Sequence, residues 1–167
     1  MKAVKYITVL ALLISAGVLT AGAAYGQEDE ETAVKTALEG FYASLNLMFE
    51  GEASAAEEVW SHSDDVVYMG ADGAYNRGWE ETYSNWKKQA ALKLGGQVEP
   101  VDVVVTVGED IAVTHQYVKG VNTNIDGERK DASLRASSVF RKENGKWKMI
   151  GHHVDVIPDL EKKLQVQ

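Results

Sequence analysis

The second half of the chain repeats β-branched segments separated by short turn sequences, and this pattern narrows the available folds more than any other feature. Four segments are predicted as strands: 98–107, 111–121, 130–141 and 146–155. The connections between them contain Gly108-Glu109-Asp110, Asp126-Gly127 and Asn144-Gly145, and Asn-Gly and Asp-Gly pairs are strong hairpin signals. The sequence therefore predicts an antiparallel meander of four strands.

The first half of the chain has a helical period instead. Between residues 32 and 51, apolar side chains recur at steps of three and four: Val34, Leu38, Phe41, Leu45 and Phe49. Thr32 is the expected N-cap, a short helix follows from Ser54, and a third helix covers 78–94. A short strand is expected at 66–70 and a loop at 71–76. These elements predict one α+β domain in which the helices cover one face of the sheet and leave a cone-shaped cavity.

The first 26 residues have the layout of a secretory signal peptide. Lys2 and Lys5 precede an apolar run over 6–19, and small residues follow it. Cleavage before Gln27 is expected, and cleavage after Ala24 is the alternative. Retention as an anchor is a further alternative, although a run of about 14 residues is short against the roughly 20 that span a bilayer.

This interpretation divides the chain into four parts. They are a signal peptide at 1–26, an acidic leader at 27–31, the α+β domain at 32–158 and a polar tail at 159–167. We expect the mature protein to be periplasmic or secreted, and to have no membrane contact after cleavage.

Composition removes several classes of function. The chain contains no cysteine, which excludes disulfides, thiolate catalysis and cysteine-bound metals. Its formal charge is −8, and loss of the two leader lysines makes it −10. Because no basic stripe opposes this charge, nucleic acid is not expected as a partner. No cofactor is predicted.

Three stretches carry a resemblance to a known family. They are DDVVYMGADGAYNRGWEETYSNW (64–86), RASSVFRKENGKW (135–147) and WKMIGHHVDVIP (147–158). In this order they resemble the SnoaL-like branch of the nuclear transport factor 2-like, or ketosteroid isomerase-like, superfamily. The resemblance covers about 32–158. It implies a conical barrel in which a curved, mainly antiparallel sheet wraps around N-terminal helices, with a pocket between them and a homodimer formed through the sheet.

The closing strand places two histidines next to each other. In a regular strand Trp147, Met149 and His153 share one face, and His152 lies on the other. The two imidazoles then point apart, so they cannot bind one metal ion as neighbours, and no metal site is predicted. His153 is expected to face the pocket, either as a general base or as a histidine that orders the strand.

Other polar residues are weaker candidates. Arg135 and Ser137 share a face of the preceding strand and are expected to look into the cavity, where the guanidinium could bind a carboxylate or an enolate-like oxygen. A salt bridge at the rim is the alternative for Arg135. Asp65 is the second candidate base, with a turn cap as its alternative. The residues predicted to bind a ligand are Tyr42, Tyr68, Trp79, Trp86, Arg135, Ser137 and His153.

Three functions remain compatible with the sequence. The first is an exported domain that binds a small, partly apolar molecule without an assigned reaction. The second is an enzyme of the lyase or isomerase type that uses His153 or Asp65 as its base. The third is a module that forms homodimers through its sheet. The sequence does not decide whether the protein is an enzyme, because this fold supports many unrelated functions.

Overall fold

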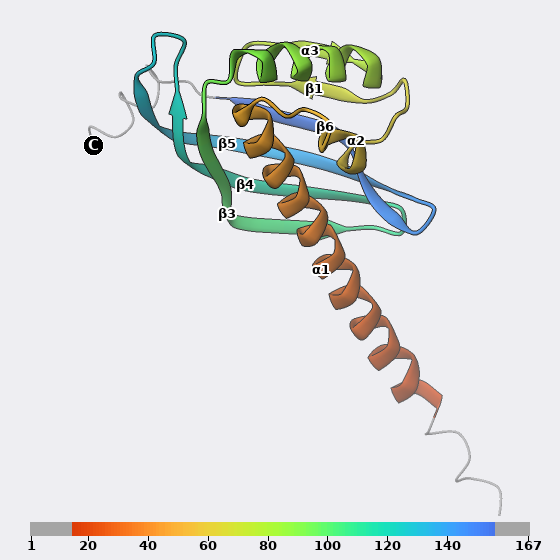
Figure 1. The fold of residues 1–167 in the computed structure, drawn as a ribbon. Coiled ribbons are helices and arrows are strands. Elements are labelled where there is room, and N and C mark those ends of the chain that lie inside the picture. Colours follow the sequence, from red (N-terminus) through yellow and green to blue (C-terminus); the bar gives the residue numbers. More distant parts are fainter. Residues whose placement is uncertain (1–14, 156–167) are drawn as a thin grey trace, which may run out of the picture.

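The computed structural model describes residues 15–155, with side chains from Asp29 onward (Figure 1). Three helices and six strands follow one another along the chain. They are α1 (Ser15–Glu50), α2 (Ala56–Val59), β1 (Val67–Met69), β2 (Tyr75–Arg77), α3 (Gly78–Leu92), β3 (Gly96–Val107), β4 (Ile111–Thr123), β5 (Arg129–Glu143) and β6 (Lys146–Asp155). The predicted α+β class is confirmed.

All six strands form one sheet in the order β2-β1-β6-β5-β4-β3. The predicted four-strand meander is confirmed, and its final turn uses Asn144 and Gly145 at φ 51° and 79°. Both values are positive, as a two-residue hairpin loop requires. β1 joins β6 in parallel, and β2, which pairs with β1, begins in the segment predicted as a loop and ends one residue beyond it. β2 escaped prediction because its residues, Tyr75, Asn76 and Arg77, show no apolar run and no alternation of apolar and polar side chains.

The helices cover one face of this curved, open sheet. In Figure 1, α1 crosses that face and extends past the sheet at its N-terminal end, while α3 lies over β1. This arrangement agrees with the predicted cone. Among the described helices, none has both the length and the apolar character needed to cross a bilayer.

The predicted start of the first helix at Thr32 is wrong, because α1 already includes residues 15–31. No helix breaker separates 27–31 from the rest of the helix. Within this segment Glu30 forms an ion pair with Lys142 at 2.5 Å and accepts a hydrogen bond from the Trp147 indole at 2.9 Å. Residues 1–14 of the predicted signal peptide and the predicted tail at 159–167 lie outside the described residues.

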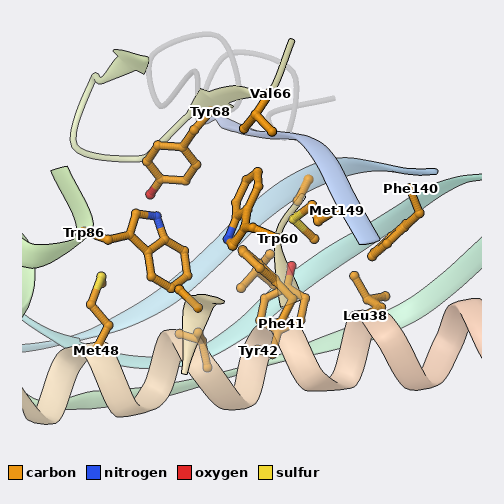
Figure 2. Packing of buried hydrophobic residues seen from close by; sticks show 14 of the residues in the cluster. Leu38, Phe41, Tyr42, Met48, Trp60, Val66, Tyr68, Trp86, Phe140 and Met149 are labelled. Atoms are coloured by element: carbon orange, nitrogen blue, oxygen red, sulfur yellow. The ribbon is translucent and has the colours of Figure 1, made fainter. Parts of the chain in front are cut away.

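The core is an aromatic cluster between α1, α3 and the sheet. Phe41, Trp60 and Trp86 are almost completely buried, and Figure 2 shows them gathered above α1. The Phe41 ring centroid lies 5.9 Å from that of Trp60 and 5.8 Å from that of Trp86. Trp86, predicted as a ligand contact, is therefore a core residue.

A β-bulge in β6 decides which histidine faces the helices. Val139 pairs with Gly151 and Phe140 pairs with Met149, so one extra residue, Ile150, lies in β6. A single extra residue moves every later side chain to the opposite face. Trp147 and Met149 are buried before the bulge, and His152 is buried after it, whereas His153 is exposed. The prediction that His153 faces the pocket is wrong for this reason.

Candidate functional site: a cavity between the helices and the sheet

A cavity of about 660 Å³ lies between the helices and the covered face of the sheet, and we call it the inner cavity. It is bordered by α1, by the turn between β1 and β2, and by the segment that follows α3. Apolar and aromatic side chains form most of its wall: Phe41, Tyr42, Leu45, Phe49, Tyr68, Val98, Val118, Leu134 and Val154. The polar lining comprises Asp72, Gln89, Asn122, Thr123, Asn124 and His152. An apolar hollow with a few polar groups is the usual form of a small-molecule site.

A buried chain of hydrogen bonds connects α1 to the last three strands at this cavity. Gln116 on β4 donates through Nε2 to the Tyr42 hydroxyl and to Ser138 Oγ, each at 3.2 Å. Ser138 Oγ lies 3.0 Å from His152 Nδ1. Ser138 accepts from Gln116 and can donate its own proton to Nδ1; with that direction, the neutral imidazole carries its proton on Nε2. The two ends of this chain, Tyr42 and His152, both line the cavity.

Burial favours the uncharged form of each of these groups. Desolvation, with a smaller effect from His153, lowers the pKa of His152 to about 3. Burial raises the pKa of Tyr42 to about 12, although the hydrogen bond from Gln116 opposes this effect. The pKa of Tyr68 is also raised by burial, and the nearby negative charge of Asp72 adds to the shift. At neutral pH the cavity therefore presents hydroxyl and imidazole groups that can form hydrogen bonds with a ligand without carrying charge.

One carboxylate stands at the edge of the inner cavity. Asp72 lies in the turn between β1 and β2, and its side chain is held from α3 by Asn85 at 3.1 Å and Gln89 at 3.3 Å. The backbone N–H of Ala74 donates to its other oxygen at 3.2 Å. Three donors thus fix the position of this group beside the cavity wall.

The predicted aromatic contacts divide between different environments. Tyr42 and Tyr68 line the inner cavity, and their role as ligand contacts stays a prediction. Trp79 does not line it. Its ring is stacked between His62 at 4.5 Å and Tyr83 at 4.7 Å, which fastens the loop before β1 to α3.

Arg135, Ser137 and His153 lie on the opposite face of the sheet from the inner cavity. The alternation predicted for β5 is correct, but the buried residues are Ala136, Ser138 and Phe140. The prediction that Arg135 and Ser137 face inward is therefore wrong. All three residues instead line a second depression of about 490 Å³, the outer hollow. Ser137 Oγ there lies 2.9 Å from His115 Nδ1.

Asp65 is held in a surface ion pair away from the cavity. Its carboxylate lies 2.6 Å from the Arg141 guanidinium and accepts a hydrogen bond from Ser63. These contacts, Arg141 first, lower the pKa of Asp65 to about 2. Such a carboxylate is a weak base at neutral pH, and it does not line the inner cavity. Its contacts tie the segment before β1 to β5.

Within the described part of the chain, no group of three or more histidine, cysteine, aspartate or glutamate residues is arranged to hold a metal ion. The described lining of the inner cavity offers hydroxyl, amide and imidazole groups, aromatic surfaces and one carboxylate.

A sequence profile of the SnoaL-like domain matches residues 34–158. The chain belongs to this SnoaL-like family. This result confirms the resemblance and places the match on the elements that enclose the inner cavity. A comparison with curated proteins found no match.

Solved structures with the same fold support this assignment. A protein of the NTF2-like family from Streptomyces avermitilis has 20% identity and a TM-score of 0.68, and the match covers 78% of this chain and 98% of that one. An NTF2-like protein of unknown function from Pseudomonas putida has 16% identity and a TM-score of 0.63, covering 78% and 88%. An NTF2-like superfamily protein from Salmonella enterica has 15% identity and a TM-score of 0.60, covering 74% and 92%. At these identities the similarity concerns the fold alone.

Four polar residues of this SnoaL-like domain were not selected from its sequence. Gln116 and Ser138 lie in phase with the apolar residues of their strands, which is a detectable sign of an inward polar group. His152 is signalled only indirectly, because a glycine inside a strand, here Gly151, often marks a bulge. Asp72 carries no sequence signal, since it depends on how α3 packs against the β1–β2 turn.

Proposed function

We propose that this SnoaL-like domain binds a small, partly apolar molecule in the inner cavity. The observation that carries the proposal is the combination of a 660 Å³ cavity with a buried hydrogen-bond chain ending at Tyr42 and His152. The volume falls within the range of about 300–1,000 Å³ typical of ligand sites. A fold of this family supports small-molecule binding or isomerase-like activity, and the position of the cavity is consistent with both.

Binding without an assigned reaction is the function that the geometry supports best. The enzyme hypothesis relied on His153 or Asp65 as the base. His153 is exposed on the outer face, and Asp65 is ion-paired to Arg141 outside the cavity. His152 does line the cavity, but burial lowers its pKa to about 3. An imidazole with so low a pKa is a weak base at neutral pH.

The cavity can be tested with a pair of variants on α1. Leu45 lines the inner cavity, whereas Leu47, two residues further on, is 41% exposed and does not line it. A tryptophan at position 45 would occupy ligand volume, and one at 47 would project into solvent. We expect Leu45→Trp to weaken binding of the neutral fluorescent probe N-phenyl-1-naphthylamine by roughly tenfold or more, on the order of the 1.4 kcal/mol that corresponds to a tenfold change.

The measurement is a fluorescence titration, with thermal stabilisation by the probe as a second readout. Leu47→Trp should bind like the unmodified protein. Equal weakening by both variants, or a titration of the unmodified protein that does not saturate, would contradict binding in the inner cavity.

We further propose that the protein is exported, with cleavage before Gln27, and that it forms a homodimer through the outer face of the sheet. The N-terminal sequence supports export. Exposed apolar side chains at Val104, Ile111 and Tyr117 on the outer face support self-association. Native mass spectrometry of the exported protein is expected to give the mass of two chains that each lack residues 1–26. A chain that retains Met1 would contradict export with cleavage, and a single-chain mass at tens of micromolar protein would contradict the dimer.

A further inference from the structure

The described lining of the inner cavity carries formal charge of one sign. Of the lining residues that the structure describes, four are ionisable: Tyr42, Tyr68, Asp72 and His152. The two phenols are uncharged at neutral pH, as free tyrosine is, and burial favours the neutral form of the histidine as well. No lysine or arginine of the described segment lines the cavity. Among the described lining residues, the Asp72 carboxylate is therefore the single source of formal charge.

Asp72 is held in place but not neutralised. Its three hydrogen-bond donors, the Ala74 N–H and the Asn85 and Gln89 amides, are all uncharged. Of the ion pairs formed between described residues, none involves Asp72. A fixed carboxylate without a cationic partner attracts a positive group that comes within a few ångströms.

Aromatic surface leads up to this carboxylate. Asp72 Oδ1 and the Tyr68 hydroxyl oxygen both lie close to Gly70. A Cβ atom at this glycine would be 2.3 Å from the first oxygen and 2.5 Å from the second. The rings of Phe41 and Tyr42 line the cavity further in. Aromatic faces attract cations as well as apolar groups. The cavity thus offers apolar walls inside and a carboxylate with a phenol at its edge.

From this arrangement we infer that the ligand is an organic amine. This inference rests on the proposed function of the inner cavity. The apolar body of the ligand lies against Phe41 and Tyr42, and its ammonium group lies at Asp72, where the exposed edge lets it keep part of its hydration. Carboxylates and phosphates are disfavoured, because they would find no cation among the described lining residues and would approach the charge of Asp72.

Three indoles of similar shape and different charge test the inference: tryptamine, indole-3-ethanol and indole-3-propionate. Their dissociation constants are measured by calorimetry at pH 7 with the mature protein. We expect the amine to bind roughly threefold to fivefold more tightly than the alcohol, as is typical of a partly exposed charge pair, and the acid to bind more weakly than the alcohol. The preference for the amine should shrink as salt is added.

Two variants with the same charge change assign the effect to one residue. Asp72→Asn should make the amine and the alcohol bind equally, while continued binding of the alcohol shows that the cavity is intact. Asp110→Asn, in the β3–β4 turn and outside the cavity lining, should leave the preference unchanged.

Each outcome has one meaning. Equal binding of amine and alcohol by the unmodified protein, or tighter binding of the acid, would overturn the amine inference and leave the cavity proposal standing. Loss of preference in Asp110→Asn as well as in Asp72→Asn would assign it to net charge and would also overturn the inference. Failure of all three indoles to bind, together with failure of the neutral naphthylamine probe, would contradict the proposed function itself.

Discussion

Replacing Phe41 with alanine is expected to lower the free energy of unfolding by about 3–5 kcal/mol, the usual cost of removing a buried aromatic ring. Phe41 is fully buried and contacts the rings of Trp60, Trp86 and His152, the last at a centroid distance of 4.5 Å. These partners come from three separate parts of the chain, so they cannot all move inward to fill the space. Removal of the ring would also enlarge the inner cavity, which Phe41 lines.

Chemical denaturation followed by tryptophan fluorescence and by circular dichroism measures this effect. Phe41→Leu, which keeps most of the volume, should cost no more than about 1.5 kcal/mol. Tyr75→Ala, which removes a ring that is 58% exposed, should change stability by less than about 0.5 kcal/mol. A loss below about 1 kcal/mol in Phe41→Ala would contradict the central position of this residue in the core.

The elements that the sequence predicted are those in which local pattern and tertiary packing agree. The strands β3 to β6 were recognised because β-branched residues alternate between turns such as Asn144-Gly145, whose positive φ values the structure shows. The helix α3 was recognised because its buried side chains, including Trp79 and Trp86, recur at helical spacing. In these segments the local signal is strong enough to fix the type of element without knowledge of its neighbours.

The site could not be predicted in the same way, because it depends on features that act across the sheet. One extra residue at Ile150 exchanges the positions of His152 and His153, and the alternating pattern alone does not show where such a residue lies. The pairing of β1 with β6 joins segments that are far apart in sequence, and it brings Tyr68 opposite His152. The sequence therefore selected a correct group of neighbours in Arg135, Ser137 and His153 but assigned them to the wrong face.

The hydrogen-bond chain shows why the cavity and the stability of the fold are linked. Its members come from α1, β4, β5 and β6, so it forms only when the sheet has curved around the helix. A buried polar group is tolerated when its partners are in place and is costly when they are missing. His152 stabilises the assembled cavity only while the imidazole remains neutral.

This dependence predicts a loss of stability on the acid side. His152 has a folded-state pKa of about 3, well below its usual 6.5, because burial penalises the charged form. Between these values the unfolded chain binds a proton that the folded chain does not. The stabilisation is therefore complete above pH 6.5 and is lost as pH falls toward 3, at up to about 1.4 kcal/mol per pH unit.

The variant His152→Gln separates this effect from other acid-labile contacts. It should be less stable than the unmodified protein at pH 7, but its free energy of unfolding should change less between pH 6.5 and 4.5. Asp65, whose folded-state pKa is about 2 against a usual 3.8, stabilises the fold above 3.8 and loses its effect only at lower pH, outside this window. His153→Gln is the control, since it keeps the buried imidazole and its hydrogen-bond chain and should retain a steeper acid-side slope than His152→Gln. Parallel pH profiles for His152→Gln and the unmodified protein would show that the buried imidazole does not cause the loss of stability at acid pH. They would also contradict a hydrogen-bond chain that ends at a neutral His152.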